Sequence, residues 1–83
     1  MTERKGIEKV REGLVLLIDG MIDMTDELVK EGLERQDVRD AINYRLDLIE
    51  GYLADAHRYR VPGAQISSLD LRYKSLKSEV GKK

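Results

Sequence analysis

The chain has 83 residues, no cysteine, one histidine and a formal net charge of −1. The lack of cysteine excludes disulfides and thiolate metal sites, and a single histidine excludes a zinc site built on several histidines. A chain this short buries only about 60–65% of the surface that its unfolded form exposes, so small folds usually need a staple. By elimination we expect this staple to be association with another helical chain.

The composition is typical of solvated helices. Charged residues make up 37% of the sequence, with one proline and neither phenylalanine nor tryptophan. The longest uninterrupted apolar run, residues 14–18, is far shorter than the ~20 residues of a membrane span. The polar N-terminus does not resemble a signal peptide, so we expect a cytoplasmic protein and no membrane contact.

The first predicted helix, about 3–31, carries two adjacent apolar stripes. The first follows alternating steps of three and four, the a and d positions of a heptad: Ile7, Val10, Leu14, Leu17, Met21, Met24 and Leu28. The second stripe runs beside this seam: Val15, Ile18, Ile22 and Val29. A helix with two adjacent apolar stripes must contact two neighbours, as in a bundle.

A row of glycines borders the seam. Gly6, Gly13 and Gly20 all occupy heptad position g, although each glycine in a helix interior costs about 0.8–1 kcal/mol relative to alanine. A residue without a side chain lets a neighbouring backbone approach closely. The recurrence therefore predicts a close helix–helix crossing, with glycines that the helix merely tolerates as the alternative. We predict that the seam and its glycine edge form a homodimer contact.

The same helix carries an acidic run. Asp19, Asp23 and Asp26 share one face, and such spacing could serve a divalent metal. The run lies opposite the seam, and no metal-binding motif accompanies it. We therefore predict a solvated face, no metal and no cofactor.

The second predicted helix, about 37–59, folds back on the first. Gly32 is expected to end the first helix in the left-handed conformation, and the short link that follows gives an antiparallel hairpin. Asp37 is the expected N-cap. Arg45 falls near the middle of an apolar face, where an arginine needs a partner. It either fixes the register of the bundle through an ion pair or contacts an acidic partner.

A short third helix, about 67–80, is expected after the Pro62–Gly63 break, with Ser67 as its N-cap. Its single apolar stripe needs a groove in which to dock. The stripe again follows steps of three and four: Ile66, Leu69, Tyr73, Leu76 and Val80.

Motifs of comparable helical enzymes are missing. Helical chorismate mutases bind a dianionic substrate with basic residues from the middle of their first helix, yet no Lys or Arg lies between Glu12 and Val29. Nucleotide pyrophosphatases of the MazG type use Glu-x-x-Glu followed by Glu-x-x-Asp, whereas Asp47 and Glu50 reverse the second pair. We therefore expect no enzymatic activity.

The densest basic patch lies at the end of the second helix. Basic residues beside a tyrosine can grip phosphates and stack bases, but positive charge at a helix C-terminus is also favoured by the helix dipole alone. The candidate contacts to a protein partner or to phosphates are Arg45, His57, Arg58, Tyr59 and Arg60.

Together these features predict an all-α fold: an antiparallel hairpin with a short third helix, dimerising into a four-helix-type bundle. The predicted function is that of a non-enzymatic module that acts as a homodimer and binds a larger protein. The alternative is a nucleic-acid-binding accessory protein that uses residues 57–60 and the basic C-terminal helix.

Overall fold

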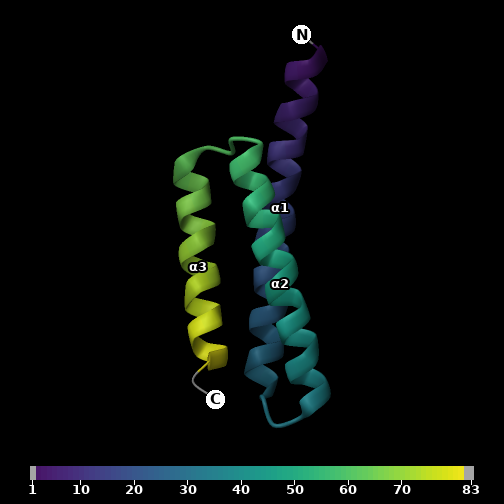
Figure 1. The fold of residues 1–83 in the computed structure, drawn as a ribbon, viewed down its shortest axis with the longest axis vertical. Coiled ribbons are helices and arrows are strands. Elements are labelled where there is room, and N and C mark those ends of the chain that lie inside the picture. Colours follow the sequence, from purple (N-terminus) through teal and green to yellow (C-terminus); the bar gives the residue numbers. More distant parts are fainter. Residues whose placement is uncertain (1, 82–83) are drawn as a thin grey trace.

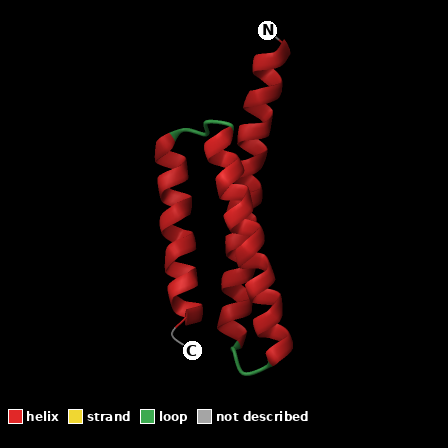
Figure 2. Cartoon of the chain, viewed as in Figure 1, coloured by secondary structure: helices red, strands yellow, loops and turns green. Residues whose placement is uncertain are grey.

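The structure, a computed structural model, describes residues 2–81 as three helices joined by two short loops. α1 spans Thr2–Glu31, α2 spans Gln36–Arg58 and α3 spans Gly63–Gly81. Consecutive helices run antiparallel, so α1 and α3 point in the same direction (Figure 1). Helix and loop account for the whole described range (Figure 2), which confirms the all-α prediction.

The first residue of the turn between α1 and α2 adopts the conformation that the sequence predicts. Gly32 adopts a positive φ of 117°, and its N–H donates to the Val29 carbonyl at 3.1 Å, so α1 ends as predicted. The prediction of Asp37 as the N-cap is wrong, because α2 begins at Gln36 and the cap is Arg35. Asp37 instead lies in the first turn, where the helix dipole favours a carboxylate. Its Oδ2 accepts a hydrogen bond from Arg35 Nη2 at 2.7 Å.

The start of α3 also differs from the prediction. The helix begins at Gly63, about one turn before the expected cap Ser67. Pro62 supplies the first acceptor, because its carbonyl accepts hydrogen bonds from the N–H groups of Gln65 and Ile66 at 3.0 and 3.1 Å. A proline has no N–H to leave unpaired at the start of a helix, so it serves there without a polar cap. Ser67 lies inside α3 with its side chain exposed.

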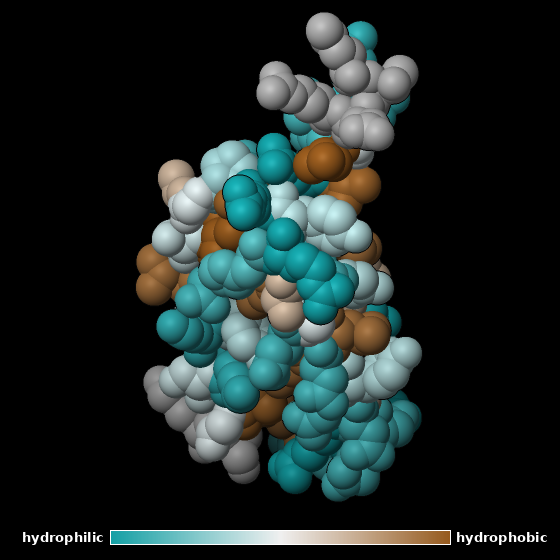
Figure 3. Space-filling view, turned by 45° about the horizontal axis from the view of Figure 1, so that its top comes forward, coloured by the Kyte–Doolittle hydropathy of each residue, from teal (hydrophilic) through white to brown (hydrophobic). Residues whose placement is uncertain are grey.

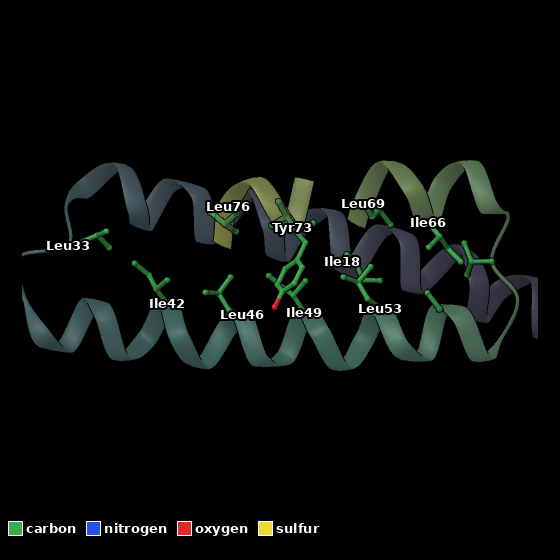
Figure 4. Close-up of a cluster of buried hydrophobic side chains, with 13 residues drawn as sticks. Ile18, Leu33, Ile42, Leu46, Ile49, Leu53, Ile66, Leu69, Tyr73 and Leu76 are labelled. Atoms are coloured by element: carbon green, nitrogen blue, oxygen red, sulfur yellow. The ribbon is translucent and has the colours of Figure 1, made fainter. Parts of the chain in front are cut away.

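The core lies between all three helices (Figure 4). α2 contributes five buried residues: Ile42, Leu46, Ile49, Leu53 and Ala56. α3 contributes four: Ile66, Leu69, Tyr73 and Leu76. Each loop adds one, Leu33 and Val61. α1 contributes Ile18 and Ile22, together with a fully buried Thr25. The Thr25 hydroxyl donates to the Met21 carbonyl at 2.7 Å, so its burial leaves no unpaired donor.

The two α1 stripes enter this core to different extents. Ile18 and Ile22, from the second stripe, are 0% and 3% exposed. Leu17 and Met24, from the heptad seam, are 41% and 54% exposed. The chain therefore buries the middle of the second stripe, whereas much of the seam stays partly exposed and only Met21 and Leu28 of it pack against the core.

The first turns of α1 project beyond the loop between α2 and α3 (Figure 1). This part of the helix carries Ile7 at 42% exposure. Hydrophobic surface is visible there, next to the grey atoms at the end of the chain (Figure 3).

Tyr73 joins α3 to α2 by a polar contact at the edge of the core. Its ring is buried, and its hydroxyl donates to Glu50 Oε2 at 3.1 Å. Burial of the phenol and the hydrogen bond to Glu50 raise the pKa of Tyr73 to about 12. The folded state thus holds the proton more tightly than the unfolded state, whose tyrosine pKa is about 10.

We expect the Tyr73–Glu50 contact to stabilise the fold below pH ~10 and to be lost as the pH rises towards 12. The measurement is tyrosinate absorbance against pH, followed together with circular dichroism. One of the four tyrosines should ionise late, and Tyr73→Phe should remove that late step. Tyr44→Phe, at a side chain that is 66% exposed, is the control and should leave the late step in place. Loss of the late step from Tyr44→Phe instead would contradict this assignment.

Candidate functional site

One side of the α1–α2 hairpin carries an apolar surface that no part of the described chain covers. We call it the hairpin face. Its α1 half is the heptad seam from Val10 onward: Val10, Leu14, Leu17, Met21, Met24 and Leu28. Its α2 half follows the same alternation of three and four residues: Val38, Ala41, Arg45, Leu48, Tyr52, Asp55 and Tyr59. Two seven-residue repeats on adjacent antiparallel helices are the pattern of a bundle that continues to further helices.

The positions of α3 contacts locate this face. On α1, Asp19 and Asp23 flank the core stripe on one side and bind Arg72 of α3. The heptad seam flanks the core stripe on the other side at about 100° per residue. On α2, Glu50 lies on the flank that meets Tyr73 of α3, and the α2 half of the hairpin face lies on the opposite flank. The hairpin face therefore points away from α3.

The side chains of the hairpin face are partly exposed along its whole length. Val10 and Tyr59 are each 42% exposed, at the end of the bundle where the α2–α3 loop lies. Met21, Leu28, Val38 and Tyr52 are half-buried against the edge of the core. A largely apolar face of this kind, interrupted on α2 by Arg45 and Asp55, is a typical protein–protein contact surface.

The glycine edge borders this face on α1 and is open within the chain. A Cβ added to Gly6, Gly13 or Gly20 would meet no atom within 4 Å. The close helix crossing that these glycines predict is therefore not made by α2 or α3. It stays a prediction for a contact with another chain.

Arg45 lies within the hairpin face and is half-buried. It makes no ion pair or hydrogen bond with the rest of residues 5–81, so neither of its two predicted roles, an ion pair that fixes the bundle register or a contact with an acidic partner, is tested within that range. Asp55, ten residues further along the same α2 stripe, is also half-buried and likewise makes no side-chain contact of this kind in that range. Asp55 is not among the predicted site residues, although its heptad spacing from Arg45, Leu48 and Tyr52 can be read from the sequence.

The acidic run of α1 is only partly a solvated face, which corrects the prediction. Arg72 Nη2 donates to Asp23 Oδ1 at 2.6 Å, and Arg72 Nη1 donates to Asp19. The hydrogen bond with Asp19 is the main cause that raises the pKa of Arg72, so the guanidinium stays charged. These pairs hold α3 against α1. No local sequence signal predicts these pairs, because the partners lie 53 and 49 residues apart.

The basic patch lies at the exposed end of α2. His57, Arg58, Tyr59 and Arg60 are all exposed. Arg11 joins this end of the molecule, since its Nε donates to the Tyr59 carbonyl at 2.6 Å. The cationic groups there are accompanied by carboxylates, because Glu8 and Glu12 line a groove next to the loop after α2. A polyanion at this end would meet both signs of charge.

That groove lies between α1 and the α2–α3 loop. Its volume is about 520 Å³, and its lining includes Val15, Leu16, Pro62 and Gln65. Leu16 is 72% exposed, so it offers an apolar contact on a side of α1 that is separate from the hairpin face.

No family model, curated protein or solved structure matches this chain. Within the described residues, no helix is long and apolar enough to span a membrane. In the same range, no three His, Cys, Asp or Glu side chains gather where a metal ion could be held.

Arg72→Ala should weaken the docking of α3 on α1. We expect the free energy of unfolding to fall by about 1 kcal/mol, a modest loss because the ion pairs are partly exposed to solvent. The loss should shrink in about 1 M salt. Chemical denaturation at both salt concentrations measures it. The control Lys74→Ala removes the Lys74–Asp70 pair within α3 and should cost only about 0.3 kcal/mol. Equal losses from the two variants would contradict the docking role.

Proposed function

We propose that this protein is a non-enzymatic interaction module that acts as a helical homodimer and binds a larger protein. The observation that carries the proposal is the uncovered hairpin face. Water contacts apolar side chains along two helices there, and burial of apolar surface is worth about 25 cal/mol per Å². A second hairpin supplies a surface of the same shape, as an isologous dimer requires.

The remaining exposed surface would then meet the larger protein. Leu16 and its groove lie on a different side of α1 from the hairpin face, so dimerisation leaves them accessible. The mixed charges at the end of α2 favour a protein surface over a nucleic acid, because Glu8 and Glu12 would repel phosphates.

The test is the solution mass by light scattering across a concentration series. We expect the wild type to have the mass of a dimer down to low micromolar concentration. Leu17→Glu and Met24→Glu each place a charge on the hairpin face, and both should give monomers at the same concentrations. Both side chains are solvent-exposed in the single chain, so the helical content of the monomer should be kept.

Leu16→Glu is the matched control, next to Leu17 in sequence but on another side of α1. It should leave the dimer mass unchanged. A monomeric wild type at high concentration would overturn the homodimer. Equal effects of Leu16→Glu and Leu17→Glu would show that the hairpin face is not the contact.

A further inference from the structure

Building on the proposed dimer, we infer how the second copy sits on the hairpin face. The two hairpins pack with α1 against α1 and α2 against α2, each pair antiparallel, about a two-fold axis that passes near Gly20 and Glu50. In this arrangement Arg45 of each copy forms an ion pair with Asp55 of the other.

The charges on α2 select the register. In an antiparallel pair of helices, each a position shares a layer with a d position of the other helix. Arg45 occupies an a position, and the d positions of this stripe are Ala41, Leu48 and Asp55. Asp55 is the one that carries a carboxylate. Pairing Arg45 with Asp55 of the second copy places the symmetry axis near residue 50.

The same register fits the neighbouring layers. An axis near residue 50 sets Leu48 against Tyr52 of the second copy and Ala41 against its Tyr59. The first is an apolar pair, and the second sets a small side chain against a large one, which is how facing core positions interdigitate. Each of these layers occurs twice, because the arrangement is symmetric.

The contacts within one chain give an independent position for the axis on α1. Arg11 Nε reaches the Tyr59 carbonyl at 2.6 Å, which places residues 11 and 59 within the reach of one arginine side chain along the bundle. Gly20 lies nine residues further along α1, and Glu50 lies nine residues back along α2. These two residues are therefore at a similar height, because both helices rise about 1.5 Å per residue. Figure 4 agrees, since Ile18 lies across from Ile49 and Leu53.

Gly20 therefore lies where α1 would cross its own copy. It is at the g position that borders the seam, and a Cβ there would meet nothing within 4 Å in the single chain. The heptad layers place the crossing within one residue of Gly20, because Leu17 against Met21 and Leu14 against Met24 of the second copy centre it at residue 19. The register that the charges select on α2 thus places a glycine at the crossing on α1.

The other way to stack two hairpin faces about a two-fold axis would place α1 against α2 of the second copy. The seam of α1 carries no carboxylate, so Arg45 would then face apolar side chains without a partner. A buried charge without a partner is strongly unfavourable. The α1–α1 and α2–α2 arrangement avoids this.

The size of the hairpin face is sufficient for a stable contact. From Val10 to Leu28 the seam is about 27 Å long at about 1.5 Å per residue, and two helices are about 20 Å wide. Because side chains corrugate this rectangle, its accessible surface area is of the same order as the ~800 Å² that each partner buries in a standard interface.

Single-cysteine variants test the register, because the natural chain has no cysteine. We expect Gly20→Cys to form a covalent dimer rapidly upon oxidation or with a short bismaleimide. Gly13→Cys and Gly6→Cys are matched controls on the same edge. In the antiparallel arrangement their thiols lie about 21 and 42 Å from their counterparts, so they should not cross-link. Cross-linking of all three variants would indicate parallel helices and overturn the inference.

Charge exchange tests the ion pair. Arg45→Glu and Asp55→Arg should each raise the dissociation constant at least about 100-fold, because each places two pairs of like charges in the contact. The double variant should return to within about tenfold of the wild type. Lys77→Glu, an exposed change on α3, is the control and should leave the constant unchanged. Single variants without effect, or a double variant without rescue, would overturn the pairing.

The outcomes also separate this inference from the proposal on which it rests. A wild type that stays monomeric overturns the homodimer itself and points to a different protein on the hairpin face. A stable wild-type dimer in which Gly20→Cys does not cross-link, or in which the charge exchange does not rescue, overturns the arrangement alone.

Discussion

The structure depends on one constraint: α1 has more apolar surface than the described part of its own chain covers. Its stripe of Ile18 and Ile22 meets α2 and α3 and is buried, while Leu17 and Met24 on the adjacent seam stay partly exposed. A third helix can occupy only one flank of a helical hairpin. The other flank of α1 and the matching flank of α2 then form a single apolar surface, and the proposed homodimer is the arrangement that would bury it.

The two arginines nearest to the helix contacts show how charge divides between these flanks. Arg72 lies where α3 meets α1 and is neutralised there by Asp19 and Asp23. Arg45 lies on the opposite flank, half-buried, with no such partner among residues 5–81. A charge in a partly apolar surface contributes less to affinity than to register, because a shifted partner would leave it unpaired. The proposed two-fold arrangement about Gly20 and Glu50 would give Arg45 that partner.

Local sequence signals predicted the elements better than their boundaries. The helix end at Gly32 was readable because a left-handed residue favours glycine. The starts of α2 and α3 were not, since Asp37 and Ser67 are good caps by residue type, but the chain begins its helices at Gln36 and Gly63. Packing decides such boundaries: Leu33 and Val61, on either side of α2, are both buried, which holds the loops close to the core.

By itself, the sequence determined that the protein is helical, that it has three helices, and that α1 carries two adjacent stripes. These features follow from periodicity, which is a local property. Only the tertiary structure decided which stripe is buried, that Asp19 and Asp23 bind Arg72, and that Arg45 shares an uncovered face with Asp55. Periodicity gives the angle of each side chain around its own helix, but not which neighbour lies at that angle. The side on which α3 returns supplies that information.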